Sequence, residues 1–103
     1  MDVQLKKGLL DTCVLSCLRA GESYGYKLIT EVNGIIEVSE STLYPILRRL
    51  ENGGYLETQS HTHGGRLRKY YYITATGREK LKAAKQDFIE MRHIFEEIFW
   101  KED

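Results

Sequence analysis

The sequence contains few of the residues that mark secreted or disulfide-rich proteins. Its 103 residues include two cysteines, one proline and one tryptophan. Cys13 and Cys17 are four positions apart, so a helix would carry both on one face, where they could not join distant segments. Small secreted domains usually need several disulfides, so this pair is more typical of small buried side chains in a reducing compartment. A redox or metal-binding role stays an alternative.

Long hydrophobic runs are also absent. No apolar stretch approaches the roughly 20 residues that cross a bilayer, and the N-terminus lacks the pattern of a signal peptide. The hydrophobic share of 42% and the charged share of 29% are those of an ordinary globular domain. We therefore expect a single cytoplasmic domain with no membrane partner.

The chain has no net charge, but its charges are sorted along the sequence. Residues 61–85 hold seven basic residues and one acidic residue, whereas residues 86–103 hold two basic and six acidic residues. This distribution predicts a basic face around residues 61–85 and an acidic far end. Overall neutrality does not exclude DNA as a partner, because affinity depends on the charges that reach phosphates.

Two amphipathic patterns predict helices in the first third of the chain. Apolar residues recur at helical spacing and predict a helix over residues 5–20, ended by Gly21. Ser23 is the predicted N-cap of a second helix over residues 24–33. The short apolar loop at residues 34–38 could add a brief strand to a neighbouring sheet.

A third helix begins at a serine cap, either Ser39 or Ser41, and ends at Asn52–Gly53–Gly54. Its predicted buried stripe consists of Leu43, Ile46, Leu47 and Leu50. The opposite side exposes Ser41, Thr42, Tyr44, Arg48 and Arg49.

Residues 55–61 and 67–73 are rich in aromatic and β-branched residues and predict two strands. Gly64 and Gly65 supply the positive φ angles of the hairpin turn between them. Tyr71 and Ile73 are the predicted core residues of the second strand. A helix followed by a basic hairpin indicates a winged helix-turn-helix, an α+β but mostly α domain over residues 1–74.

Residues 75–103 predict a long last helix capped by Thr74. Its apolar residues alternate at spacings of three and four, which is typical of a helix–helix seam. A helix of about 25 residues spans roughly 38 Å and is too long for so small a domain to cover, so we expect a homodimer. The predicted dimerisation seam consists of Leu81, Ala84, Phe88, Met91, Phe95 and Ile98.

The predicted DNA contacts come from the third helix, the hairpin tip and the N-terminus. Exposed residues near the start of a reading helix approach base edges, and basic residues at a wing reach the backbone or minor groove. The candidates are Ser39, Ser41, Thr42, Tyr44, Arg48, Arg49, His63, Gly64, Gly65, Arg66, Arg68 and Lys69, with Lys6 and Lys7 as either backbone contacts or ordinary surface charges.

Enzyme motifs are missing from the sequence. It has no nucleophile motif, no phosphate-binding glycine loop and no paired acids, and Ser39 and Ser41 are better explained as helix caps. His61 and His63 share a strand face but have no third ligand at usual zinc spacing. We expect no catalysis, metal or cofactor. A winged helix that binds another protein instead of DNA is the alternative, and the neutral overall charge favours it.

Several segments together resemble the PadR family of winged-helix regulators. They are KGLL at residues 7–10, SYGYKLI at 23–29, SESTLYPILRRL at 39–50, GGR at 64–66, RKYY at 68–71 and TATG at 74–77. Leu67 and Tyr72 depart from residues that are common in the family. The resemblance implies a homodimer that represses transcription from a pseudo-palindromic operator and leaves it when an effector binds.

The single C-terminal helix resembles the short PadR subfamily, in which some members bind flat hydrophobic compounds between subunits. Phe88 falls where similar regulators place an aromatic residue that faces the central cavity. Phe95, Phe99 and Trp100 follow it, so these four residues form either an effector pocket or packed dimer seam.

Overall fold

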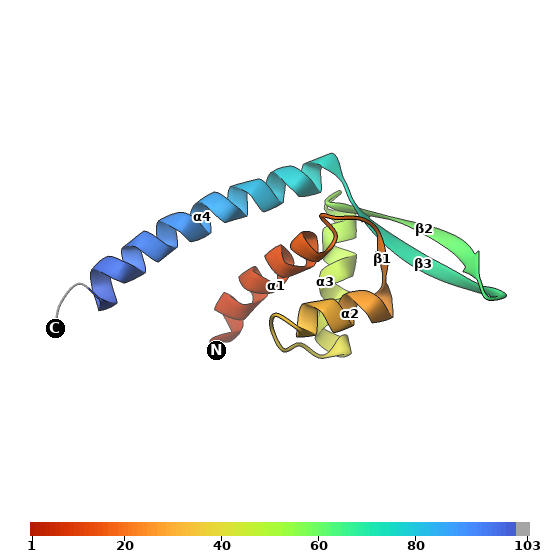
Figure 1. The fold of residues 1–103 in the computed structure, drawn as a ribbon, viewed down its shortest axis with the longest axis horizontal. Coiled ribbons are helices and arrows are strands. Elements are labelled where there is room, and N and C mark those ends of the chain that lie inside the picture. The colour runs from red at the N-terminus through yellow and green to blue at the C-terminus, as the bar shows by residue number, and fades with distance from the viewer. Residues whose placement is uncertain (101–103) are drawn as a thin grey trace.

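The computed structural model describes residues 1–100, which fold into four helices and a small antiparallel sheet (Figure 1). The helices are α1 (Val3–Cys17), α2 (Gly25–Asn33), α3 (Glu40–Asn52) and α4 (Ala75–Phe99). The strands are β1 (Ser23–Tyr24), β2 (Leu56–His63) and β3 (Arg66–Ile73), in the order β1-β3-β2. The mostly helical winged architecture is therefore confirmed. Residues 101–103 of the predicted dimerisation segment lie outside the described residues.

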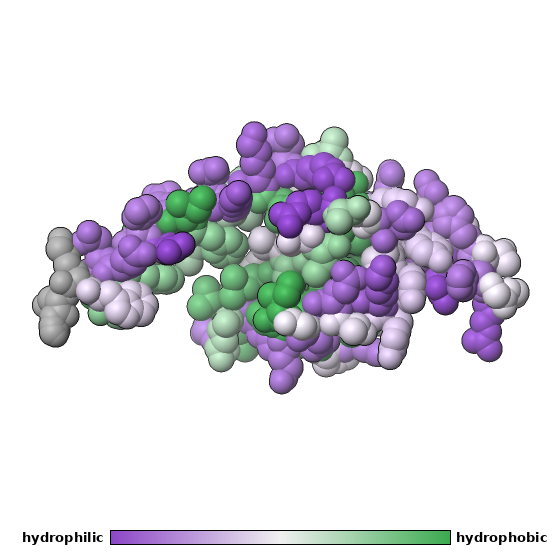
Figure 2. Space-filling model, viewed as in Figure 1, coloured by the Kyte–Doolittle hydropathy of each residue, from purple (hydrophilic) through white to green (hydrophobic). Residues whose placement is uncertain are grey.

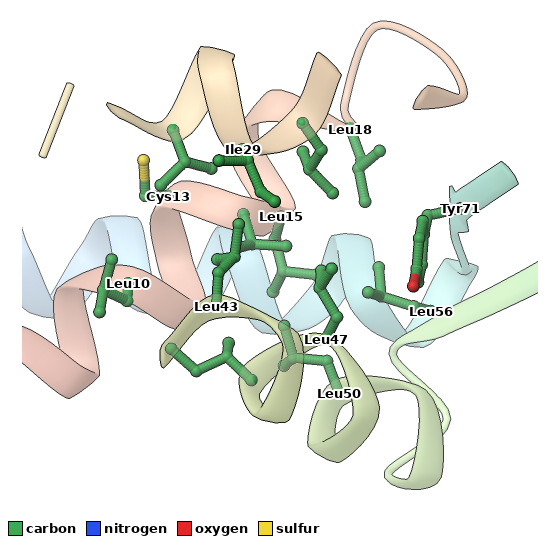
Figure 3. Close-up of a cluster of buried hydrophobic side chains, with 14 of the residues drawn as sticks. Leu10, Cys13, Leu15, Leu18, Ile29, Leu43, Leu47, Leu50, Leu56 and Tyr71 are labelled. Atoms are coloured by element: carbon green, nitrogen blue, oxygen red, sulfur yellow. The ribbon is translucent and has the colours of Figure 1, made fainter. Parts of the chain in front are cut away.

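The core lies where α1, α2 and α3 meet the sheet (Figure 3). Leu43, Ile46, Leu47 and Leu50 are all buried, so the stripe predicted for α3 is confirmed. Tyr71 is buried and Ile73 packs against the cluster, which supports both core predictions for β3. Burying one such leucine stabilises a fold by about 1.5–3 kcal/mol. These side chains fix α3 and the wing to the same body.

The start of α2 corrects the prediction. Ser23 does not cap the helix, because Ser23 and Tyr24 pair with Tyr71 and Tyr70 as the third strand of the sheet. Tyr24 occupies the cap position without a side-chain hydrogen bond. The buried Ser23 hydroxyl instead donates to Glu31 Oε1 at 3.4 Å. The edge strand is thus built from residues that were expected to begin a helix.

Two other boundaries also differ from the prediction. Residues 34–38 add no strand: the backbone N–H groups of Ile35 and Ile36 donate to Val32 O and prolong the end of α2 as a turn. Helix α1 begins at Val3, because the Asp2 carboxylate accepts from the N–H groups of the first turn. It ends at Cys17, before Gly21.

Cys13 is buried and Cys17 is half-buried, as small core side chains would be. The hydrogen bond between the two thiols lowers the pKa of Cys13 and, with burial, raises the pKa of Cys17.

Hydrogen bonds hold the start of α4 against the body of the domain. We call this contact between Thr74, Gly77, Gly54 and Tyr55 the joint. The Thr74 side chain accepts from the Gly77 N–H at 2.9 Å and donates to Gly54 O at 2.7 Å. The Thr74 N–H donates to Tyr55 O at 3.1 Å. The predicted cap at Thr74 is confirmed, and these bonds tie the start of α4 to the turn that follows α3.

Beyond this joint α4 runs past α1 and extends from the body, at the end opposite the wing (Figure 1). The described part of the chain measures 61 × 27 × 21 Å. Gly77 is the only buried residue of α4. None of the helices within residues 1–100 is long and apolar enough to cross a membrane.

Candidate nucleic-acid interface

The N-terminus of α3 presents a cluster of hydroxyl groups. Ser39 is the N-cap: its Oγ accepts from the Thr42 N–H at 3.3 Å. The same oxygen lies 3.0 Å from Ser41 Oγ and 3.0 Å from Thr42 Oγ1. All three side chains are exposed. The start of the helix therefore offers several donors and acceptors, together with the positive end of the helix dipole.

Tyr44 and Arg48 lie further along the exposed side of α3. A Cβ atom on Gly25 would lie only 2.7 Å from the Tyr44 hydroxyl, so Gly25 gives Tyr44 room to lie against the start of α2. Tyr44 still keeps 38% of its surface exposed. Burial, with Tyr44 and Glu51 nearby, raises the pKa of Tyr71 despite the opposing effect of Arg48. Both candidates therefore lie near Tyr71 of β3.

The wing turns at Gly64 and Gly65, whose φ angles are 59° and 79°. Two positive φ angles in a two-residue loop are those of a type I′ hairpin turn. His63 and Arg66 pair across this turn and are both exposed. His61, two residues from the tip, lies 3.2 Å from the Tyr72 hydroxyl and packs near the Tyr70 ring. Arg66 and His63 are the side chains placed at the very tip.

Lys6 and Lys7 lie beside the start of α3. They line a groove of about 380 Å³ together with Glu37, Ser39 and Thr42. Basic side chains beside a helix N-terminus form a favourable site for a phosphate group. The structure thus brings the N-terminal part of α1 and the start of α3 to one surface.

Three of the basic residues predicted to contact DNA interact with other side chains of the same chain. Arg49 forms an ion pair with Asp11 of α1. Lys69 lies 3.6 Å from Glu51, and the Arg68 guanidinium lies 4.0 Å from the centre of the Tyr24 ring. The predictions missed Asp11, Tyr24 and Glu51 as supporting residues, because only the fold brings them near. Each of these cations therefore positions an element as well as adding positive charge.

The charge distribution needs a correction. The basic stretch 61–85 was expected to surround the hairpin, but only Arg66, Arg68 and Lys69 lie on β3. The other four basic residues belong to α4: Arg78, Lys80, Lys82 and Lys85. In Figure 1, α4 runs along the side of the body opposite the N-terminus of α3. The basic residues therefore form two separate groups.

The predicted seam of α4 is only partly covered in a single chain: Leu81, Ala84, Phe88 and Met91 are half-buried, and Phe95 and Ile98 are exposed. Leu81 packs against the core, whereas Phe95 is 41% and Ile98 is 61% exposed. Figure 2 shows hydrophobic residues gathered between α1 and the middle of α4, with hydrophilic residues over the wing. One cavity of about 510 Å³ lies there, and Phe88, Phe95 and Trp100 line it with Leu5 and Leu9.

Phe99 does not line this cavity. Its ring packs against the rings of Phe95 and Trp100, with centroid distances of 6.0 and 5.7 Å. Three of the four aromatic residues predicted for the pocket therefore meet in one cavity, and the fourth supports two of them.

Comparisons with known proteins show chains of the same fold. A relative from Lysinibacillus sphaericus, described only as an uncharacterized protein, is 30% identical over 95 residues, 87% of each chain. The crystal structure of a PadR-like transcriptional regulator from Bacillus cereus is 34% identical, with a TM-score of 0.84 over 96% of this chain and 99% of that one. A transcriptional regulator from Clostridium thermocellum is 28% identical, with a TM-score of 0.85 over 98% and 99% of the two chains.

The sequence pattern of one family, described as "Transcriptional regulator PadR-like family", matches residues 14–83. The match includes α2, α3, the wing and the first turns of α4. The chain belongs to the PadR-like family of transcriptional regulators.

Proposed function

We propose that the protein is a homodimeric, sequence-specific DNA-binding repressor that a small hydrophobic or aromatic effector releases from its operator. Residues 1–74 would bind DNA and residues 75–103 would join the subunits. The observation that carries the proposal is the surface that combines the exposed side of α3, the groove at Lys6 and Lys7, and the wing tip. A repressor of this kind acts without catalysis and in the cytoplasm, where its DNA partner lies.

In this mode α3 enters the major groove, with Ser41, Thr42 and Tyr44 at the base edges. Lys6, Lys7 and Arg48 contact phosphates beside it, and Arg66 reaches the backbone or minor groove from the wing. Arg49, held by Asp11, fixes α3 against α1. A two-fold dimer places two reading helices about one DNA turn apart, which calls for a pseudo-palindromic operator.

Replacing Arg66 by alanine is expected to weaken binding to every DNA sequence by a similar factor. A cation that contacts phosphate contributes about one unit to the slope of log affinity against log salt, so that slope should flatten by about one unit for each half-site. Fluorescence anisotropy across a salt series measures both effects. An unchanged slope would show that the wing tip does not touch phosphate.

Thr42→Ala should act differently, because its hydroxyl is placed to contact bases. We expect the ranking of operator variants to change, with an effect of about 1–3 kcal/mol at one base position. The test is competition binding against a panel of single-base operator variants. Equal loss for all variants would assign Thr42 to the backbone instead. Arg66→Ala is the matched control, since it should preserve the ranking.

The cavity between α1 and α4 supports the effector part of the proposal. Its apolar wall and its volume of about 510 Å³ suit a flat aromatic compound. Trp100 is the only tryptophan of the chain and lines this cavity, so its emission should respond to a ligand that binds there. An effector should quench that emission and release operator DNA over the same concentration range. Release without a change in Trp100 emission would place the effector elsewhere.

A further inference from the structure

The two cysteines of the chain form a pair of neighbouring thiols near the end of α1. Cys13 and Cys17 are four residues apart on this helix, so their side chains lie on the same face. Cys13 is 8% exposed and belongs to the core, and Cys17 is half-buried against that core. A hydrogen bond joins the two free thiols. The chain has no other cysteine, so a ligand that bonds to thiols can act only here.

One thiol of the pair opens to a small pocket. Its volume of about 180 Å³ equals that of about six molecules of liquid water. Pockets for drug-sized ligands are larger, at roughly 300–1,000 Å³. The residues that line the pocket are Cys17, Ala20, Gly21, Glu22, Ser23, Lys27 and Glu31. The pocket therefore suits a ligand of few atoms.

This pocket is separate from the proposed subunit contact. Its walls come from the end of α1, the turn after it, β1 and α2, and no residue of α4 lines it. The other side of the thiol pair belongs to a cavity of about 400 Å³ that includes Cys13 and also Phe88 of the seam, so a partner subunit could close that side. Access through the pocket at Cys17 does not depend on the seam. Lys7, which faces the start of α3, is roughly 15 Å away along α1.

The spacing of the two cysteines does not suit a direct bond between their sulfur atoms. Side chains four residues apart on a helix have Cβ atoms about 5–6 Å apart. A disulfide needs a Cβ–Cβ distance of about 3.5–4.5 Å. Forming one would therefore distort α1 where it packs in the core. A single atom that bonds to both sulfurs spans the extra distance without this distortion.

The surroundings favour one kind of bridging atom. Structural Zn²⁺ is tetrahedral and takes more protein ligands than two thiols, and residues 1–100 contain no group of three or more His, Cys, Asp or Glu side chains that could hold a metal ion. The hydrogen bond to Cys13 and burial, with Glu31 nearby, raise the pKa of the Cys17 thiol. Two thiolates side by side are therefore disfavoured. A ligand that removes both thiol protons and leaves a neutral product avoids burying this charge.

We propose that Cys13 and Cys17 bind a small trivalent arsenical, which enters at Cys17 and bonds to both sulfur atoms. With arsenous acid, two arsenic–sulfur bonds form and two arsenic–oxygen bonds break. Each departing hydroxyl group leaves as water with one thiol proton. Arsenic stays trivalent, so the step consumes no oxidant or reductant, and its product is neutral. The third substituent on arsenic, a hydroxyl or a small organic group, lies in the pocket at Cys17.

The test is titration of the full chain with sodium arsenite and, separately, with phenylarsine oxide. Intact mass and a count of free thiols follow each titration. We expect one arsenic atom per chain and the loss of both thiols. The affinity for each probe is compared with that of dithiothreitol for the same probe, which distinguishes an inorganic ligand from an organic one. No binding of either probe, or the loss of only one thiol, would overturn the proposal.

Cys17→Ala should weaken arsenite binding by about 10²-fold or more, because the second bond is then no longer intramolecular. The matched control is Cys17→Ala/Arg19→Cys, which keeps two thiols but places the second beyond the end of α1 and off the face of Cys13. It should bind arsenite as weakly as Cys17→Ala does, with both variants folded by circular dichroism. If this control binds as tightly as the unchanged chain, the helical spacing is irrelevant and the assignment is wrong.

Two further readouts test the geometry and the independence of the site. Dilute hydrogen peroxide should form no disulfide in the folded chain, and rapid formation of one would contradict the spacing argument. Cys17→Ala should keep the oligomeric state and DNA affinity of the unchanged chain, and a change in either would mean that Cys17 serves those contacts instead. The arsenite titration needs no DNA, so its failure leaves the proposed DNA binding untouched.

Discussion

Gly77→Ala is expected to lower the free energy of unfolding by about 3 kcal/mol, because alanine would insert a methyl group into a site that is already full. A Cβ atom there would lie 2.2 Å from the carbonyl oxygen of Tyr55 and 2.8 Å from Ile73 Cγ1. That oxygen belongs to the backbone and accepts from the Thr74 N–H, so it cannot rotate away. The loss should outweigh the roughly 1 kcal/mol that alanine gains over glycine in a helix.

Gly8→Ala is the matched control. Gly8 lies inside α1, and no atom outside its own helix turn would come within 4 Å of an added Cβ. Alanine there should stabilise the chain by about 0.5–1 kcal/mol. In thermal unfolding the melting temperature should fall by roughly 10–20 °C for Gly77→Ala and rise slightly for Gly8→Ala. Equal shifts for the two variants would mean that the joint does not depend on Gly77.

Phe95→Glu is expected to abolish the proposed dimer and leave a monomer. Phe95 is 41% exposed in the single chain, so a glutamate can reach water without disturbing the core. In a two-fold dimer each substitution occurs twice, and each buried phenylalanine is worth about 1.5–3 kcal/mol. Two carboxylates in the seam would add a desolvation cost. Affinity for a two-half-site operator should fall with the loss of the second reading helix.

Light scattering during size-exclusion chromatography measures this directly. The mass should drop from twice 12.0 kDa to 12.0 kDa. Gln86→Glu adds the same charge to an exposed position half a helix turn away from the seam and should leave the dimer intact. A dimer that survives Phe95→Glu would place the subunit contact on another surface.

Features that depend on a repeating apolar pattern or on a few neighbouring residues could be predicted from the sequence. The four-residue stripe of α3, the Thr74 cap and the glycine turn of the wing each depend on residues close together in the chain, so local rules apply. The strand Ser23–Tyr24 could not be predicted in this way. Two residues have no measurable period, and their partners Tyr70 and Tyr71 come from a distant part of the chain.

In the candidate interface, too, features set by neighbouring residues could be predicted, whereas contacts between distant residues could not. Residue types predicted which side chains would stand on α3 and at the wing tip. The ion pair between Arg49 and Asp11 depends on two helices meeting, and a count of charges along the sequence cannot detect it. The count of charges also assigned all seven basic residues of 61–85 to the hairpin. These residues are continuous in the chain, but the fold divides them between the hairpin and the start of α4.

The central claim is that α3, the wing and the N-terminal lysines form one DNA-reading surface. The most direct measurement is a fluorescence-anisotropy titration of the protein with DNA from upstream of its own gene, beside a scrambled duplex of equal length and a salt series. The account predicts tight binding that prefers the native fragment and weakens steeply with salt. Weak binding that is equal for both duplexes at every salt concentration would contradict it and would favour a winged helix that binds protein.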